Sequence, residues 1–473
     1  MEKGILIILF VGQQYCDMNN NFWKSLIIGL ILLVGTQAFG ATYYVDADAD
    51  AGGDGTTTAT TGAQCAWDHL SDITAASFNA DDQILLQKGD TWTGENLYFG
   101  GDEGSGTSGH PIILGSYGTG ARPIIDTNSA AANAMNFEDL NYWTIQGLEF
   151  KGGTLNQLIF HADDAAMTDI IMEDCIVNAS TSAAGNHAVQ ITESGFAATN
   201  IKISKCSITG TSGTGDGINA FAVTSGLNIY KNYIYSVGGD CIDVAGGDLH
   251  IVNANLCKSA GANGIKVHGQ QHLLTNVVVR NNIVNHDTGT GYGIVIQDST
   301  DGLIYNNTVY MAAGVGHYAA MQFDEPNTPD SFTGNIIKNN VCYGNPDFSG
   351  CWWVDDSVQN TFTASNTFSN NCIYTANAVI IDMDSGTDIG TANWAAVWLP
   401  NHPDDINTDP LFTNAAGGDF TLTPQSPARD TGVYLPGYEA KLDPTSSWPD
   451  DVRTRDDILS IGAYAVNRGV GIL

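Results

Sequence analysis

Basic residues are scarce in this sequence. Its 473 residues include 17 Lys and Arg against 51 Asp and Glu, so the formal net charge at pH 7 is −34. A chain this acidic repels the phosphate backbone of DNA and RNA, which argues against a nucleic-acid partner. An acidic polysaccharide would be repelled as well, unless cations lie between the two.

Long hydrophobic runs are missing beyond residue 41, so we expect no membrane span. The apolar run before that point belongs to residues 18–41, MNNNFWKSLIIGLILLVGTQAFGA, where it follows Lys24 and precedes the small-residue end at 38–40. This order is typical of a secretory signal peptide.

We therefore predict a signal peptide over residues 1–40, with cleavage near Gly40 and translation that starts at either Met1 or Met18. The mature protein is then secreted, into the periplasm or the extracellular space. Eight Cys follow the leader, and an exported protein can pair them. Cys342 and Cys351 are the pair closest in sequence, but small apolar residues in a core explain the cysteines equally well.

Helical periodicity is also missing, and a repeat takes its place. One strand-like segment type recurs eight times, from IIMEDCIV to TFSNNCIY, with a mean spacing of 28 residues over the seven steps. This is the period of a solenoid coil. Each segment carries one Cys or Asn at the same position, namely Cys175, Cys206, Asn232, Asn255, Asn282, Asn307, Asn340 and Asn371.

A second strand type follows each of these segments after a short Gly-rich turn, as in HAVQIT, DGINAF, DCIDVA, NGIKVH and YGIVIQ. Both types alternate apolar and polar residues, as half-buried strands do. Parallel strands joined by short turns, without helical crossovers, are possible in a parallel β-helix. The sequence therefore predicts an all-β, single-domain right-handed parallel β-helix, in which the Asn column forms a ladder of stacked turn amides rather than a ligand site.

The ends of such a solenoid need covering. Residues 65–78, CAWDHLSDITAASF, can form a short amphipathic helix over the first coil, and from about residue 401 the repeat gives way to a Pro- and Asp-rich segment. We predict a β-helix over 41–400 with an N-terminal helical cap, an irregular C-terminal closing segment over 401–473, and a monomer.

Four segments resemble the opening and ending of secreted bacterial β-helix proteins related to pectate lyases. They are YYVDADADAGGDGT at 43–56, KGDTW at 88–92, PIILGSYGTGARPIID at 111–126 and SPARDTG at 426–432. The resemblance covers nearly the whole mature chain. It implies the fold, and it leaves lyases, hydrolases, epimerases and binding proteins open.

Candidate chemistry emerges when the second strands are aligned on their buried residues Val189, Ile218, Ile242, Ile265 and Ile294. Two positions before them stand His187, Asp216, Asp240, Asn263 and Tyr292, and one position after them stand Gln190, Asn219, Asp243, Lys266 and Val295. We expect both columns to face outward, one strand spacing apart from coil to coil.

Carboxylates on neighbouring coils repel one another unless a cation offsets their charge. Asp216, Asp240 and Asp243, with the Asn219 amide, supply hard oxygen ligands that suit Ca²⁺. A solvated acidic face without metal explains the same residues. Lys266, the only Lys in this column, favours the first interpretation.

Two motifs in this region resemble family 9 polysaccharide lyases. GDCID at 239–243 is similar to their calcium motif and ANGIKVHG at 262–269 to their catalytic-lysine motif, although Gly239 stands where an Asp is expected. The resemblance implies that Lys266 is the base of a β-elimination. TGDGI at 214–218 and GDCI at 239–242 are also similar to the aspartate motifs of polygalacturonases, but the Gly-His-Gly and Arg-Ile-Lys motifs of that family are absent.

The chemistry of a lyase accounts for this set of residues. The enzyme removes the weakly acidic proton at C5 of a uronate and expels the oxygen at C4. Calcium between protein and substrate carboxylates would stabilise the developing charge. His268, His187 and Tyr292 are candidate substrate contacts on the same side. Arg280 lies on the other strand type and is expected on another face, and a Lys266/Arg280 pair like that of chondroitinase-B-type lyases is an alternative.

The sequence thus favours a secreted lyase that acts on a pectate- or alginate-like acidic polysaccharide. Two other classes remain open. One is a hydrolase that uses Asp216 and Asp240, and the other is a non-catalytic β-helix that binds glycan or serves as a surface structure.

Overall fold

The computed structural model describes residues 40–433 except 214, 222, 270–272, 314–315, 317, 327–331, 349 and 360, together with the short stretches 441–442, 452–453 and 462. The predicted signal peptide lies outside the described residues, apart from Gly40. Most of the predicted closing segment after residue 433 lies outside them too.

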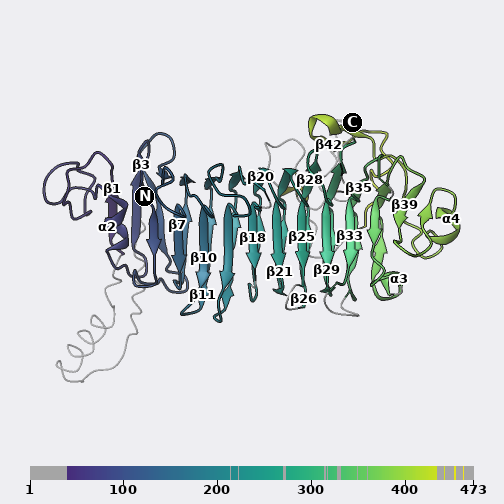
Figure 1. Cartoon of the computed structure of the whole chain (residues 1–473), viewed down its shortest axis with the longest axis horizontal. Coiled ribbons are helices and arrows are strands. Elements are labelled where there is room, and N and C mark those ends of the chain that lie inside the picture. Colours follow the sequence, from purple (N-terminus) through teal and green to yellow (C-terminus); the bar gives the residue numbers. More distant parts are fainter. Residues whose placement is uncertain are drawn as a thin grey trace, which may run out of the picture. The chain divides into compact units, whose positions relative to one another are not determined.

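The chain from Gly40 onward is an all-β, single-domain right-handed parallel β-helix, as predicted. Its strands lie side by side along one axis (Figure 1). Three long sheets run through the molecule and are named here sheets A, B and C.

Sheet A contains, in spatial order, β1 (Thr42–Val45), β2 (Gln83–Gln87), β5 (Ile112–Tyr117), β8 (Trp143–Gln146), β12 (Ile170–Glu173), β16 (Lys202–Ser204), β19 (Asn228–Tyr230), β23 (Ile251–Asn253), β27 (Val278–Arg280), β31 (Leu303–Tyr305), β34 (Ile336–Lys338) and β37 (Thr367–Ser369). Sheet B contains β3 (Thr91–Thr93), β6 (Ile124–Asp126), β9 (Glu149–Lys151), β13 (Ile176–Asn178), β17 (Ser207–Thr209), β20 (Tyr233–Val237), β24 (Leu256–Ala260), β28 (Ile283–His286), β32 (Thr308–Met311), β35 (Val341–Tyr343) and β38 (Cys372–Tyr374).

Sheet C contains β4 (Leu97–Phe99), β7 (Met135–Glu138), β10 (Leu158–Ala162), β14 (Val189–Glu193), β18 (Ile218–Phe221), β21 (Ile242–Ala245), β25 (Ile265–His268), β29 (Ile294–Gln297), β33 (Met321–Asp324), β36 (Trp352–Val354), β39 (Val379–Asp382) and β40 (Ile389–Gly390). Neighbours in this sheet are parallel except β39 and β40. Shorter sheets pair β11 (Met167–Thr168) with β15 (Ala198–Thr199), and join β22 (Gly247–Asp248), β26 (Leu274–Thr275) and β30 (Ser299–Thr300).

Each coil has three main strands, whereas the repeat predicts two. The first segment type is divided at its Cys or Asn position into a sheet A strand and a sheet B strand, because the preceding residue takes a left-handed backbone conformation that bends the chain. This φ lies between 54° and 58° at Asp174, Lys205, Lys231, Ala254, Asn281, Asn306, Asn339 and Asn370. Four of these residues are Asn, which tolerates that conformation well.

The predicted Asn ladder is confirmed at this bend, and we call it the Asn ladder. The Asn255 N–H and the Asn255 side-chain amide both donate to the Asn282 side-chain oxygen, at 3.0 and 3.1 Å. The same pair of bonds links every step from Asn232 to Asn371, and all six Asn side chains are fully buried. The ladder ends on Asp405, whose carboxylate accepts the Asn371 N–H at 2.7 Å.

The core lies between the three sheets and is filled by the inward residues of each strand. On sheet C the aligned residues Val189, Ile218, Ile242, Ile265 and Ile294 are all fully buried. Such continuous apolar burial is the main stabilising contribution to a solenoid. The eight cysteines from Cys65 to Cys372 are free, buried thiols, so the second interpretation of the cysteines holds.

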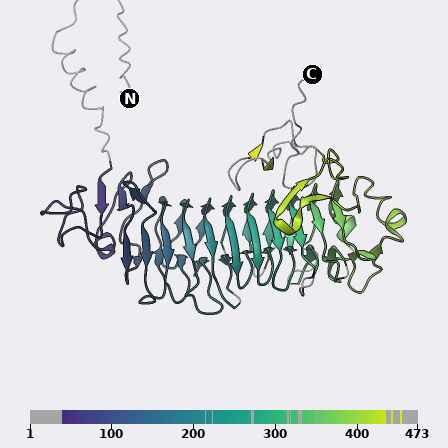
Figure 2. The ribbon, with the colours of Figure 1, turned by 90° about the horizontal axis from the view of Figure 1, so that it is seen from above.

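The N-terminal cap is a helix, α2 (Leu70–Thr74), shorter than the predicted 65–78 segment but with Leu70 and Ile73 buried as expected. The late coils carry α3 (Phe362–Ser365) and α4 (Trp394–Val397). After them the chain forms a hairpin of β41 (Phe412–Asn414) and β42 (Asp419–Leu422), joined by the 3-10 turn η1 (Ala415–Gly417), and β43 (Lys441–Leu442) pairs with β44 (Val452–Arg453). Figure 2 shows the hairpin lying alongside the β-helix, where Phe420 packs in a cluster with Ala254 and Ile283.

Candidate active site

The strand register confirms the alignment of the second strand type. Ile218 pairs with Ile242 and Ile242 with Ile265, so Asn219, Asp243 and Lys266 follow one another on neighbouring strands. The side chains of Asp243 and Lys266 are 16% and 25% exposed. These residues of the second column therefore face outward from sheet C, as predicted, whereas Val295, the next residue of the column, is almost fully buried.

In the first column His187, Asn263 and Tyr292 are partly exposed, but Asp216 and Asp240 do not face outward, and for these two the expectation was wrong. Asp216 and Asp240 are only 6% and 7% exposed, because their side chains lie along the turn that precedes each sheet C strand. The Asp216 carboxylate accepts the Asp240 N–H at 2.7 Å, and the Asp240 carboxylate accepts the Asn263 N–H at 2.7 Å. Backbone donors thus hold both carboxylates inside the turn.

The same hydrogen bond continues in both directions along the molecule. The Asn156 oxygen accepts the His187 N–H at 2.7 Å, His187 Nδ1 accepts the Asp216 N–H at 3.1 Å, and the Asn263 oxygen accepts the Tyr292 N–H at 2.9 Å. We call the side chains that accept these bonds the mixed ladder; its members are Asn156, His187, Asp216, Asp240 and Asn263. His187 Nδ1, which accepts the Asp216 N–H, also lies 3.1 Å from Asp216 Oδ2.

Asp240 is the most perturbed acid of the mixed ladder. Burial raises its pKa to about 7, with further contributions from the charges of Asp243 and Asp216. The Asn263 N–H and the Lys266 charge oppose this rise. A carboxyl group with this pKa exchanges its proton near neutral pH, which is a property of acid–base catalysts and also of buried structural acids.

Lys266 stands beside this acid in a cluster of three charged or titratable side chains. Its Nζ lies 4.0 Å from Asp243 Oδ2, and His268 Nε2 lies 2.9 Å from Asp243 Oδ1. The His268 imidazole is almost completely buried. Its contact with Asp243 lacks hydrogen-bond geometry, so His268 Nε2 and Asp243 Oδ1 both have no hydrogen-bond partner within the described residues. Asp243 therefore contacts a cation on one side and an imidazole on the other.

Tyr292 belongs to an aromatic group farther along the same side. Its ring stacks on Tyr318 at 5.1 Å and lies 5.9 Å from Trp353. Trp353 follows Gln322 in the outward column that contains Lys266, so the aromatic group lies on the late coils of the candidate face. Trp352, Trp394 and Trp398, by contrast, are buried in the late coils.

Arg280 lies on β27 of sheet A and not on sheet C, which confirms the expectation of another face. Its guanidinium donates to the Tyr305 hydroxyl at 2.8 Å. A catalytic pair of Lys266 with Arg280 is therefore not assembled in this structure.

The four predicted calcium ligands do not converge. Asn219 donates its amide N–H to Asp216 Oδ2 at 2.9 Å, so its nitrogen faces the carboxylate, and Asp240 Oδ1 accepts two bonds from Asn263. Within the described residues, the group of three acidic, His or Cys side chains whose ligand atoms all lie within 4.8 Å of one another is Asp46, Asp48 and Asp90, in the first coils. Calcium at Asp216, Asp240 and Asp243 stays a prediction.

Sequence reasoning missed the mixed ladder and a groove on sheet A. The ladder had a signal, since Asn156, His187, Asp216, Asp240 and Asn263 all precede a buried sheet C residue by two positions. The groove, described below, could have been found by aligning the outward positions of the first strand type as well.

Comparisons with known proteins support the fold. The family described as "Right handed beta helix region" matches residues 216–392. No curated protein matches this sequence closely enough to serve as a relative. Among the described residues, no helix is both long and apolar enough to cross a membrane.

Several solved structures share the architecture at low sequence identity. The crystal structure of pectate lyase Pel9A is 15% identical, with a TM-score of 0.52, over 92% of this chain and 98% of that one. The GH136 lacto-N-biosidase from Eubacterium ramulus is 14% identical, with a TM-score of 0.51, over 78% of this chain and 69% of that one. The neighbours thus include a lyase and a glycoside hydrolase, and at these identities they show the β-helix fold alone.

Proposed function

We propose that this protein is a secreted polysaccharide lyase that cleaves a uronate-containing polymer, pectate- or alginate-like, by β-elimination with Lys266 as the base. The observation that carries the proposal is the position of the Lys266 amine on the outer face of sheet C, 4.0 Å from Asp243 and one coil beyond Asp240. Lys266, Asp243 and Asp240, three groups that can carry or exchange protons, thus lie close together on neighbouring coils.

The reaction would proceed as follows. The neutral Lys266 amine takes the C5 proton of a uronate, the C4–O bond breaks, and a C4–C5 double bond forms while the leaving oxygen acquires a proton. Asp243 orients the amine from the neighbouring strand. His268 lies against the same carboxylate and is almost fully buried, so it would position Asp243, and the leaving oxygen would take its proton from solvent.

Calcium was predicted to neutralise the substrate carboxylate. Because the side-chain oxygens of Asp216 and Asp240 already accept backbone and amide donors, the arrangement does not offer a converged ligand set, and no step is assigned to the metal. The motifs at 239–243 and 262–269 resemble those of family 9 lyases, and this resemblance supports the lysine base more directly than the metal.

A glycoside hydrolase is the second candidate, and one observation favours it. Asp240, with a pKa near 7, has the protonation behaviour of a general acid. Its partner Asp216 would have to activate water, but Asp216 accepts bonds at both oxygens, from the Asp240 N–H and from Asn219. A base engaged in this way is less available to a water molecule.

The experiment that tests the proposal is a screen on pectate, alginate and glycosaminoglycans, each with and without chelator. The lyase forms an unsaturated uronate, so ultraviolet absorbance rises together with new reducing ends. New reducing ends without absorbance would indicate the hydrolase. Binding to a polymer with neither signal would indicate a non-catalytic glycan-binding protein.

A further inference from the structure

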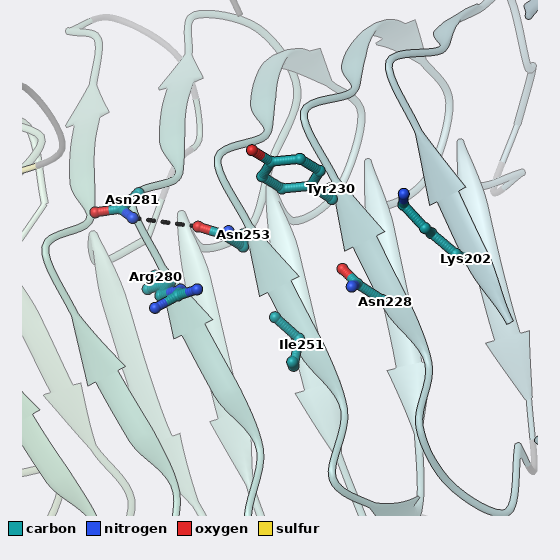
Figure 3. A pocket seen from close by; sticks show the side chains of 7 residues that line it. All are labelled: Lys202, Asn228, Tyr230, Ile251, Asn253, Arg280 and Asn281. Atoms are coloured by element: carbon teal, nitrogen blue, oxygen red, sulfur yellow. Dashed lines mark hydrogen bonds between the residues drawn. The ribbon is translucent and has the colours of Figure 1, made fainter. Parts of the chain in front are cut away.

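A groove of about 330 Å³ lies on the outer face of sheet A, away from the sheet C column that contains Lys266. Figure 3 shows the seven side chains that line it. They are Lys202, Asn228, Tyr230, Ile251, Asn253, Arg280 and Asn281. The volume lies at the lower end of the range for small-ligand pockets.

The charge of this groove is opposite to that of the protein. Two of its seven lining residues are cationic and none is acidic, in a chain with three acids for each base. Lys202 makes no ion pair within the described residues, whereas the nearby Lys205 pairs with Glu173 at 3.6 Å. The groove therefore presents positive charge that a mobile anion can reach.

The cations lie at opposite ends of the groove, and between them are the side chains of Asn228, Tyr230, Ile251 and Asn253. In one row of the sheet, Lys202 pairs with Asn228 and Asn228 pairs with Ile251. In the other row, Tyr230 pairs with Asn253 and Asn253 pairs with Arg280, which lies three strands beyond Lys202. Three strand spacings separate the two cations along the axis, about 14 Å. One small anion cannot contact both, so the spacing favours a chain molecule with several charged units.

Arg280 is fixed in place before any ligand arrives. It donates to the Tyr305 hydroxyl at 2.8 Å and lies over the Tyr305 ring, and that ring is almost fully buried. A planar guanidinium held in this way matches the two oxygens of a carboxylate.

The uncharged lining residues match the rest of a sugar. Asn281 donates to the Asn253 oxygen at 3.2 Å (Figure 3), and within the described residues the buried Asn228 oxygen lacks a hydrogen-bond partner. The Asn228 and Asn253 amides, on neighbouring strands, supply the kind of polar group that binds sugar hydroxyls. The Tyr230 ring offers an apolar surface beside these amides, and it packs against the hydrophobic cluster that contains Phe420 of the closing hairpin.

We propose that this groove is a second glycan-binding site that takes carboxylated sugar units of an acidic polysaccharide and tethers the polymer beside the catalytic face. The proposal deepens the proposed function by placing a substrate contact on a second sheet. It gives Arg280 a binding role that does not depend on Lys266.

The test uses the full mature chain with the Lys266→Ala change, so that substrate stays intact, and measures calorimetric binding of a galacturonate trisaccharide and a mannuronate trisaccharide. We expect two binding events for the preferred sugar. Lys202→Gln and Arg280→Gln should both weaken the same event, binding at the groove, about tenfold or more and leave binding at sheet C unchanged. Lys205→Gln, which removes an equal charge outside the groove, should change neither.

Further measurements distinguish a failure of the groove proposal from a failure of the lyase proposal. If the lyase proposal fails, the protein with Lys266 intact forms no unsaturated product in the screen, while the Lys202-dependent binding event remains. Arg280→Lys keeps the charge but removes the planar guanidinium, so it should weaken binding less than Arg280→Gln does. The melting temperature of this variant should stay near that of the parent. Equal binding of a carboxyl-reduced trisaccharide, equal displacement by inorganic phosphate at the same concentration, or binding that is insensitive to Lys202→Gln would each overturn the proposal.

Discussion

The two ladders of this molecule use the same hydrogen bond with different side chains. At the bend between sheets A and B, six consecutive coils carry Asn, each fully buried and bonded to the next. At the turn before sheet C the corresponding acceptors are Asn156, His187, Asp216, Asp240 and Asn263. An amide satisfies the geometry at both places, so stability alone does not require His or Asp.

The difference between the two ladders marks the coils that carry the candidate active site. The titratable part of the mixed ladder coincides with the coils that place Asp243, Lys266 and His268 on the outer face of sheet C. Asp240 lowers the stability at neutral pH, because burial raises its pKa and disfavours its charged form. A residue type that costs stability where a neutral one would serve is a recognised mark of a functional site.

The largest expected effect on stability comes from interrupting the uniform ladder. Asn282→Ala removes the acceptor of two Asn255 donors and the donor to the Val252 carbonyl. It leaves the buried Asn255 N–H and one N–H of the Asn255 side-chain amide without an acceptor, while that amide keeps its bond to the Ile229 carbonyl. At roughly 1–3 kcal/mol for each unsatisfied group, the free energy of unfolding should fall by about 3–6 kcal/mol. Chemical denaturation measures this fall. Asn401→Ala, at an exposed Asn, is the control and should change it by less than about 0.5 kcal/mol.

The mixed ladder should respond to pH where the Asn ladder does not. The pKa of Asp240 is raised to about 7 in the fold, above its value of about 3.9 in the unfolded chain. The protonated form is therefore favoured by folding, and its stabilisation is complete below pH 4 and is lost as the pH rises through 7. The loss is at most about 4 kcal/mol.

Asp240→Asn isolates this contribution, because the amide oxygen can still accept the Asn263 N–H. In buffer with chelator, we expect the variant to match the parent at pH 4 and to exceed it in unfolding free energy at pH 8. Asp164→Asn removes an exposed charge and serves as the control. A variant that is less stable than the parent at pH 8 would show that the carboxylate charge itself holds the turn.

A smaller effect is expected from calcium. If Asp216, Asp240 and Asp243 move together around the ion, calcium binds the folded form and raises the melting temperature by a few degrees. Asp240→Asn should reduce the rise. Asp48→Asn controls for the acidic group in the first coils. Identical melting curves with calcium and with chelator would favour the metal-free acidic face.

The fold could be predicted because the sequence repeat indicates the length of each coil and the positions of its strands. The mean period of 28 residues, the alternation within each strand and the Asn column all follow from the sequence, and the structure confirms the sheet C register from Val189 to Ile294. The division of each first segment into two strands was missed. It depends on a single left-handed residue per coil, and at Lys205, Lys231 and Ala254 the residue type gives no sign of that conformation.

The candidate site was predictable in its residues and less so in its geometry. Asp243 and Lys266 face outward as the alternation indicates, and His268 lies on the same strand as Lys266. The alternation could not show that Asp216 and Asp240 turn inward, because their position belongs to the turn, where hydrogen bonds to the next coil decide the side-chain direction. The groove containing Lys202 and Arg280 was missed because the outward positions of the first strand type were not aligned; their register on sheet A follows the same repeat.

The most direct test of the account is the rate of unsaturated-uronate formation by Lys266→Ala on the polymer identified in the screen. The account predicts a loss of about 10²- to 10⁴-fold in kcat, the usual effect of losing a general base, with a nearly unchanged melting temperature. Lys258→Ala, on sheet B, is the matched control and should keep full activity. A Lys266→Ala protein that forms the unsaturated product at a near-normal rate would contradict the account.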